Sequence, residues 1–522
     1  MTTTDPVPLA TLLPRVTAEM ARAVAERYGV CTRPVMRRVL DLQTGTDTRV
    51  AIRCGATRAC KCVPCADKAR RLRIHQCAEG WHRDTEPEPA DGADQIPDDS
   101  ADADAPDSGA SASEAGSRRV RSTRRRSDMP DLPRVPMEDR TIGQTFGPGD
   151  GREYRPSMFL TLTLPSYGKV RNGVPVDPDT YDYRSAALDA VLFARLVDRF
   201  FDCLRKVAGF NVQYFAAVES QLRMAAHLHA ALRGAIPRHV IKDTVAAVYY
   251  SAWWPSIDTV VYDERMPRWN GTDYVDPATG AVLPTWAAAL DQAQAAPDAE
   301  PVPVVRFGSQ TDIAGIIAPS PDADRAIRYL TKYLTKSIAD TIHPDDADIQ
   351  PDWAREAHID RLHAELRYLP CGEACANWLR YGVQPKNPTP GLRPGRCSRK
   401  AHDRENLGLG GRRVLVSRQW SGKTLTQHRA DRAQVVKEAL EEAGVLPPEI
   451  ERMAASVTMA NGRPRYVWTD AKPDLITYGQ VIMASVAEQL RWRAEYQAAK
   501  EHAAAQHAQP VDNCSATGGP AP

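Results

Sequence analysis

AIRYLTKYLTKS, residues Ala326–Ser337, carries apolar and aromatic residues at helical spacing, and the pattern predicts an amphipathic helix. Tyr329 and Tyr333 are four residues apart, so they share one face of such a helix. Lys332 and Lys336 form a second pair, about 100° around the helix axis. Two phenols flanked by two ammonium groups can act as paired nucleophiles toward a phosphate. The plainer alternative is a helix with two half-buried tyrosines.

Three segments upstream of this helix predict strands of one antiparallel sheet: 158–164 (MFLTLTL), 214–219 (YFAAVE) and 226–232 (AHLHAAL). In the last segment His227 and His229 point to one face, because successive side chains of a strand alternate. Two imidazoles spaced in this way can share one metal ion, and Glu219 on the neighbouring strand can add a carboxylate. A pair of hydrogen-bonded surface histidines is the alternative.

The eleven cysteines fall mainly into two groups, and in a chain of this size such groups favour metal binding over disulfides. Cys62-x-x-Cys65 is half of a tetrahedral zinc site. Cys31 and Cys54 are the preferred ligands for the other half of the site, and Cys60, His75 and Cys77 are the alternatives. The expected ligand set is Cys31, Cys54, Cys62 and Cys65.

A second constellation has the spacing Cys-x3-Cys followed by Cys-x4-His, which is close to that of a Cys3His zinc site. Its expected ligands are Cys371, Cys375, Cys397 and His402. Basic residues interleaved with aromatic ones occur within and after this constellation, a composition that suits contact with DNA. The expected DNA-binding residues are Lys336, Arg380, Arg393, Arg396, Arg412, Arg413, Arg418 and Lys423.

Composition shifts along the chain suggest how it is divided. An acidic stretch followed by an arginine run buries too little apolar surface to offset chain entropy, so we expect disorder there. The expected parts are a Cys-rich zinc module (1–83), a disordered acidic and Arg-rich linker (84–155), a central domain (156–345, with an insertion at about 254–303), a Cys3His zinc and DNA-binding module (346–425), a C-terminal helical region (426–507) and a disordered tail (508–522).

The length and the net charge of the chain limit the classes of function that it can have. The chain has 522 residues and a formal net charge of +1, so any contact with nucleic acid must use local basic patches. No stretch approaches about 20 uninterrupted apolar residues, and the N-terminus lacks a secretory signal pattern. We therefore expect a cytoplasmic protein without a membrane partner.

The order of the threonine-rich strand, the His-x-His strand and the tyrosine helix resembles that of HUH endonucleases, whose two-tyrosine class includes rolling-circle initiators. The cysteine groups and the stretch 412–423 resemble the replication initiators of actinomycete plasmids and integrative elements. The resemblance implies an α+β fold, an antiparallel sheet flanked by helices, with zinc-binding modules before and after it. The long acidic insert departs from the family pattern.

The resemblance also implies a reaction: nicking one DNA strand at an origin through a 5′-phosphotyrosine, followed by rejoining. His227, His229 and Glu219 would hold Mg2+ or Mn2+, Tyr333 would make the first cut and Lys332 would stabilise the reacting phosphate. Tyr329 would make the second transfer. The partners would be single-stranded or supercoiled origin DNA and a host helicase, because the chain has no Walker A motif.

Two other functions fit the same motifs. A two-tyrosine transposase or relaxase would use this chemistry for another purpose. A zinc-stabilised DNA-binding regulator would bind the same DNA and cut nothing.

Overall fold

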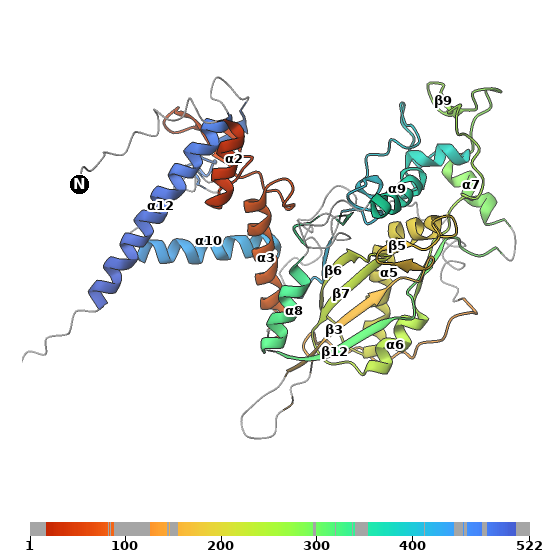
Figure 1. Cartoon of the computed structure of the whole chain (residues 1–522), viewed down its shortest axis with the longest axis horizontal. Helices are drawn as coiled ribbons and strands as arrows, with labels where there is room; N and C mark the ends of the chain where they lie inside the picture. The colour runs from red at the N-terminus through yellow and green to blue at the C-terminus, as the bar shows by residue number, and fades with distance from the viewer. Residues whose placement is uncertain are drawn as a thin grey trace, which may run out of the picture. The chain divides into compact units, whose positions relative to one another are not determined.

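The computed structural model divides the chain into two compact units, residues 73–424 and residues 1–72 with 425–522, and the boundary falls within helix α3 (Val63–Trp81). Figure 1 shows the elements of each unit. The residues described are 17–81, 83, 85–87, 126–143, 146, 155–295, 299–318, 320–332, 334–336, 338–339, 353–411, 413–442, 453, 457–471 and 478–507.

The larger unit is built on a five-stranded antiparallel sheet with the order β12-β3-β7-β6-β13. The expected strands form its centre, which confirms an α+β architecture with an antiparallel sheet. Strand β12 was not expected, and β13 is the short strand within the basic stretch 412–423. The strands are β3 (Arg155–Thr163), β6 (Tyr214–Ser220), β7 (Ala226–Leu232), β12 (Thr311–Ala318) and β13 (Val414–Val416).

Alternation along the strands gives the sheet two buried faces. Leu160, Leu162 and Leu228 point to the face covered by α5 (Tyr183–Ala208), where they join the main hydrophobic core. The opposite face is covered by α8 (Pro321–Thr331) and by the C-terminal part of α3 (Figure 1). A smaller core forms there from Phe215, Ala231, Ile327, Leu330 and Trp420, among others. The two histidines of β7 lie on this second face.

Helix α8 begins as the sequence predicts and ends earlier. The Ser320 side chain caps it by accepting a hydrogen bond from the Ala323 backbone N–H, and two acidic residues occupy its first turn. The helix ends at Thr331, so the expectation of a helix through Ser337 is wrong. The last turn tightens, with the Lys332 N–H bonded to the Tyr329 carbonyl.

Tertiary hydrogen bonds take over where α8 ends. The Arg413 guanidinium donates to the Lys336 carbonyl, and the Ile338 N–H donates to the Glu405 carbonyl. These bonds hold the chain on a course that a continuing helix would not follow. Tyr333 and Ser337 lie outside the described residues.

Part of the expected linker packs on the larger unit. The Val135 N–H donates to the Lys206 carbonyl, Glu138 forms a β-bridge with Phe210, and Arg140 lies 4.5 Å from the Phe210 ring centroid. Disorder is therefore the wrong prediction for residues 126–143. The acidic stretch and arginine run between residues 88 and 125 lie outside the described residues, as does the tail 508–522.

The insertion at 254–303 contains the expected hairpin, β9 (Arg268–Trp269) paired with β10 (Tyr274–Val275), and a short helix α7 (Trp286–Ala293). It packs on the Cys3His segment: the rings of Trp254 and Trp286 meet Trp378 at 5.6 and 4.6 Å between centroids. The elements around it include α6 (Arg238–Ala247), β8 (Tyr249–Ser251), β11 (Val304–Arg306) and α9 (Trp353–Tyr368).

The smaller unit joins both ends of the chain. Strand β1 (Val35–Asp41) pairs with β2 (Asp47–Ile52) on one side and with β14 (Tyr466–Asp470) on the other. Helix α2 (Ala18–Arg27) packs on α12 (Tyr478–His507) through buried Ala21, Ala25, Ile482 and Val486. The expected separation into an N-terminal module and a C-terminal helical region, which begins with α10 (Leu425–Glu442), therefore becomes one folding unit.

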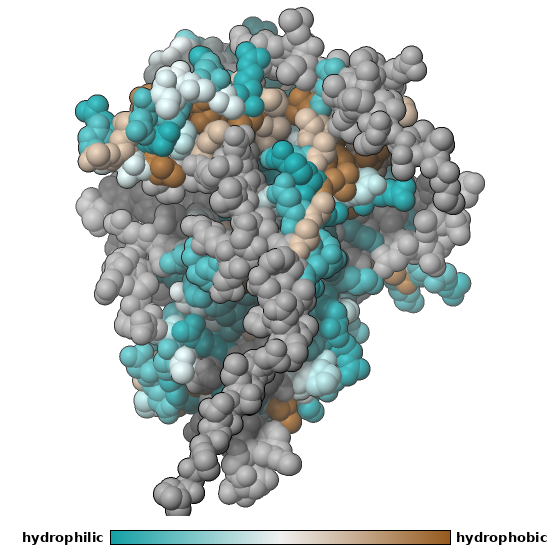
Figure 2. All heavy atoms as spheres, turned by 90° about the vertical axis from the view of Figure 1, so that its left-hand side faces the viewer, coloured by the Kyte–Doolittle hydropathy of each residue, from teal (hydrophilic) through white to brown (hydrophobic). Residues whose placement is uncertain are grey.

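The described surface is largely polar. Figure 2 shows one face, on which hydrophilic side chains dominate and hydrophobic ones form small patches between them. Among the helices that the structure describes, none has the length and apolar character needed to span a bilayer.

The pairing of the two chain ends is testable. Ile482 on α12 is fully buried against α2, so Ile482→Ala leaves a cavity and should lower the free energy of unfolding of this unit by about 2–5 kcal/mol. Leu490→Ala on the same helix, where Leu490 is 39% exposed, is the matched control. Hydrogen exchange of α2 amides measures the effect, and equal exchange in both variants would contradict the packing.

Candidate functional site

The candidate site is positioned by strand register. Glu219, His227 and Thr163 lie side by side across β6, β7 and β3. One step along, His229 pairs with Thr161, which itself pairs with Asp312 of β12. These six polar residues lie in two adjacent rows on the sheet face covered by α8.

His229 is held from both ends of its ring. Its Nδ1 lies 3.0 Å from Thr161 Oγ1, and its Nε2 lies 3.3 Å from the Tyr329 hydroxyl. The Phe159 ring stacks beside it at 5.8 Å between centroids. When Nδ1 carries the proton and donates to Thr161, the lone pair of Nε2 faces the phenol. Tyr329 is 44% exposed, so its hydroxyl touches the histidine while the residue remains open to solvent.

Both histidines are suited to bind a metal ion as neutral ligands. Burial, with the nearby charge of Arg223, lowers the pKa of His227 to about 4. Burial, with His227 next to it, lowers the pKa of His229 to about 3. The His227 Nδ1 is buried and has no hydrogen-bond partner among the described residues. An orphaned imidazole nitrogen beside a second neutral imidazole, 4.2 Å away between ring centroids, fits a divalent transition-metal ion.

Glu219 lies at the edge of this site. It pairs with His227 in register and is buried, and burial raises its pKa to about 7 against the opposing charges of Arg413 and Lys332. Among the described residues, the ligand atoms of Glu219, His227 and His229 do not all lie within 4.8 Å of one another. The carboxylate therefore borders the histidine pair without meeting both rings.

Of the other two expected catalytic residues, the structure describes Lys332 and not Tyr333. Lys332 is exposed at the end of α8, and its charge acts on Glu219, which places it at the site. Tyr333 lies outside the described residues, so the structure describes one of the two tyrosines.

Three contributors were missed by sequence reasoning. Thr161 was assigned only to a strand, although its place on the polar side of the alternation was visible. Asp312 was missed because β12 was not recognised, and its charge acts on His227. Arg223, in the turn between β6 and β7, donates to the Leu164 carbonyl at 2.6 Å and to the Pro165 carbonyl, which fastens this hairpin to the end of β3.

The first cysteine group assembles from the expected ligands. Cys31, Cys54, Cys62 and Cys65 bring their sulfur atoms within 4.8 Å of one another. Backbone N–H groups of Cys54 and Thr32 point at the sulfur atoms of Cys31 and Cys62, at 3.3 and 3.4 Å. A hydrogen bond from Cys65 lowers the pKa of Cys31 to about 5, so this sulfur is readily a thiolate. Cys60 is exposed and Cys77 is buried in another cluster, so neither joins the set.

The second group also assembles as expected, from Cys371, Cys375, Cys397 and His402. His402 Nε2 lies 3.5 Å from Cys375 Sγ, and its Nδ1 lies 2.7 Å from the Leu366 carbonyl oxygen. A donating Nδ1 fixes the tautomer that leaves Nε2 as a ligand. Both groups can therefore hold tetrahedral zinc.

The basic residues expected to bind DNA are placed unequally. Arg380 pairs with Asp263 at 2.9 Å and stacks on Tyr368, and Lys423 pairs with Glu79 at 2.9 Å. Arg413 and Lys336 are both half-buried, and the Arg413 guanidinium donates a hydrogen bond to the Lys336 carbonyl. Arg393, Arg396 and Arg418 are exposed, and Arg412 lies outside the described residues.

Zinc content tests both cysteine groups. Purified protein should carry about two zinc ions per chain, and Cys62→Ser or Cys375→Ser should each remove about one. Cys60→Ser is the matched control and should keep both ions, because its thiol lies outside the cluster. Elemental analysis of the soluble protein measures this, and zinc loss in the control would overturn the ligand set.

A known protein family matches most of the chain. The sequence model of a family described as "RepSA: Replication initiator protein, pSAM2" matches residues 17–489. No curated protein matches the chain. No solved structure matches it either.

Proposed function

Since the chain belongs to this family of replication initiator proteins, we propose that it starts replication of a plasmid or integrative element by nicking one DNA strand at the origin. The nick would leave a 5′-phosphotyrosine and a free 3′-hydroxyl, as in HUH endonucleases. The protein would later rejoin the strand, which makes it a site-specific endonuclease and strand transferase. Supercoiled or single-stranded origin DNA would be its substrate, a host helicase its partner and the cytoplasm its place of action.

One observation carries the proposal: the Tyr329 hydroxyl lies 3.3 Å from Nε2 of His229, beside an orphaned nitrogen of His227. Both histidines come from one strand and the tyrosine from a helix about a hundred residues later, so tertiary folding brings a phenol to a pair of imidazoles. This arrangement supports the assignment of Tyr329 as a nucleophile and of the histidines as metal ligands.

The chain supplies most of the reaction. The Tyr329 oxygen would form a bond to the scissile phosphorus as the bond to the 3′-oxygen breaks, the phenol proton leaving and the 3′-oxygen gaining one. Lys332 would place a positive charge near the phosphate oxygens. His227 and His229, bordered by Glu219 and Asp312, would hold Mg2+ or Mn2+. When bound, such an ion would withdraw charge from the phosphate.

The tyrosines would divide the two transfers. The resemblance assigns the first cut to Tyr333, which lies outside the described residues, and the Tyr329 hydroxyl faces His229 without DNA. We propose that Tyr329 makes the first transfer and Tyr333 the second. The Cys3His group and the exposed Arg393, Arg396 and Arg418 would contribute to the DNA-binding surface of the larger unit.

The metal role predicts a graded series. His227→Ala, His229→Ala and addition of EDTA should each abolish nicking, because the ligand pair is lost. Thr161→Val should weaken divalent-metal affinity by about 10–100-fold, because it frees the His229 ring from the bond that orients it. Mn2+ binding followed by electron paramagnetic resonance without DNA measures this directly.

Thr163→Val is the matched control, since the Thr163 hydroxyl donates to the Gln310 carbonyl and not to a histidine. Its Mn2+ affinity should equal that of the wild type. Nicking that persists in EDTA would remove the metal from the mechanism. If the protein binds supercoiled origin DNA but produces no relaxed circles, it is a non-catalytic regulator.

The tyrosine assignment predicts distinct adducts. Tyr329→Phe should lower formation of the covalent adduct on single-stranded origin DNA by roughly 10³-fold or more, because the nucleophile is removed while the ring still packs on Phe159. Tyr333→Phe should form the adduct but fail to complete the second transfer. Denaturing gels and peptide mapping of the attached nucleotide measure both effects. An adduct mapped to Tyr333 in the wild type would reverse the order of the two tyrosines.

A further inference from the structure

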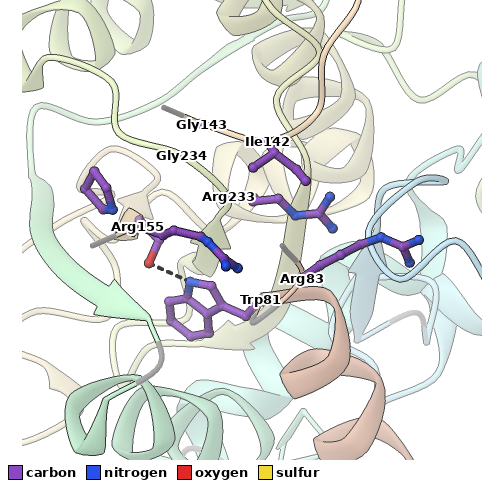
Figure 3. A pocket seen from close by; sticks show the side chains of 9 residues that line it. Trp81, Arg83, Ile142, Gly143, Arg155, Arg233 and Gly234 are labelled. Atoms are coloured by element: carbon purple, nitrogen blue, oxygen red, sulfur yellow. Dashed lines mark hydrogen bonds between the residues drawn. The ribbon is translucent and has the colours of Figure 1, made fainter. Parts of the chain in front are cut away.

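A small basic pocket lies beyond the histidine site, at the end of the sheet where β3 begins and β7 ends. It is lined by Trp81 and Arg83 from the end of α3, by Arg155 at the start of β3 and by Arg233 just after β7 (Figure 3). It encloses about 250 Å³ of space free of atoms, part of it open solvent. The enclosed part of this space is too small for a nucleotide, so a single charged group at the mouth of the pocket fits it better.

The pocket is rich in positive charge. Arg233 is 3% exposed, and its hydrogen-bond acceptors are neutral: the carbonyl oxygens of Gly80, Gln419 and Trp420 and the hydroxyl of Thr141. The carboxylate of Glu86 acts on Arg233, but it accepts hydrogen bonds from the Thr141 hydroxyl and from the backbone N–H groups of Thr141 and Ile142. This buried cation has neutral hydrogen-bond partners, and the charge of Glu86 offsets part of its positive field in the pocket.

Neighbouring arginines strengthen this field. The charge of Arg83, added to burial, lowers the pKa of Arg233 to about 10, so the two guanidinium groups repel each other. Arg83 is anchored by bonds to the carbonyl oxygens of Thr85 and Ser421. Figure 3 shows the Arg155 side chain extended beside the Trp81 indole. An anion entering between these groups would relieve the repulsion.

The walls of the pocket are rigid. The Trp81 indole N–H donates to the Ser157 hydroxyl at 2.7 Å, and that hydroxyl donates to the Ile316 carbonyl at 2.9 Å. The backbone at Gly143 crosses directly over Gly234, where an added Cβ would lie 2.4 Å from the Gly234 Cα. The Trp81 ring and the crossing of the two glycine backbones are therefore in place before any ligand arrives, which lowers the entropy cost of binding.

We propose that this pocket binds one phosphodiester group of the DNA strand, with Arg83 and Arg155 as the contacting side chains and Arg233 as the buried charge behind them. The proposal rests on the DNA-binding part of the proposed function and not on cleavage. Arg233 follows His229 by four residues of nearly extended chain, roughly 13 Å.

The salt dependence of DNA binding tests the pocket. We would measure dissociation constants of Arg83→Gln, Arg155→Gln and the double variant across a range of NaCl concentrations, on a duplex and on a single-stranded oligonucleotide. Fluorescence anisotropy reports binding, and all proteins carry Tyr329→Phe so that cleavage does not interfere. Loss of this one phosphate contact in the double variant should reduce the slope of log K against log [salt] by about 0.9 on duplex DNA and by about 0.7 on a single strand.

Two controls separate charge from structure. Arg268→Gln, at an exposed position in the β9–β10 hairpin, should leave the slope unchanged. Arg83→Lys keeps the charge but not the paired bonds to Thr85 and Ser421, so it should restore the wild-type slope if charge is what matters. Failure of Arg83→Lys to restore it would show a structural role and overturn the proposal.

The remaining outcomes are also decisive. If Arg83→Gln and Arg155→Gln both keep the wild-type salt slope while the wild type binds DNA, the pocket does not bind a phosphate of the DNA. No DNA binding by the wild type removes the proposed function as well. Thermal stabilisation by inorganic phosphate that is lost in Arg83→Gln, with unchanged DNA slopes, would assign the pocket to a free anion and overturn the DNA assignment.

Discussion

The register of β7 between β3 and β6 decides the chemistry of the larger unit. It aligns His227 with Glu219 and His229 with Thr161, and it sends Leu228 to the opposite face. A slip of one residue would bury both imidazoles among the leucines under α5 and turn Leu228 toward the site. Such a slip would bury the imidazoles in an apolar core without their hydrogen-bond partners, so the native register is strongly favoured.

The covered face also sets the properties of the site. Trp420, Phe215, Ile327 and Leu330 form a small apolar core against the same side of the sheet that carries the histidines. This core removes water from one flank of the imidazoles, which keeps them neutral, while Tyr329 remains open to solvent at the other flank. In the proposed reaction, two neutral imidazoles shielded from water beside a solvent-facing phenol would suit attack on an incoming phosphate.

The cysteine groups close loops that packing alone would leave weakly held. Cys31 and Cys54 meet Cys62 and Cys65 at the start of α3, and Cys371 and Cys375 meet Cys397 and His402 beside α9. Bound zinc would convert each set into a fixed junction and add its binding free energy to folding. The Cys3His junction also supports the insertion, whose Trp254 and Trp286 rest on Trp378.

The Cys-x-x-Cys and Cys-x3-Cys spacings indicated half of each zinc site, and the other ligands of the first site were preferred among several candidates. Local periodicity predicted the alternation of β3, β6 and β7 and the start of α8. These features are visible because side chains two, three or four residues apart share a face, whatever the rest of the chain does. Tertiary structure alone decided four others. It placed β12 and Asp312 next to β3, and it ended α8 at Thr331. It joined β1 to β14, and it gathered Arg83, Arg155 and Arg233 around one pocket. Each of these depends on partners far apart in the chain, whose pairing is chosen by burial and hydrogen-bond satisfaction across the whole fold rather than by any local pattern.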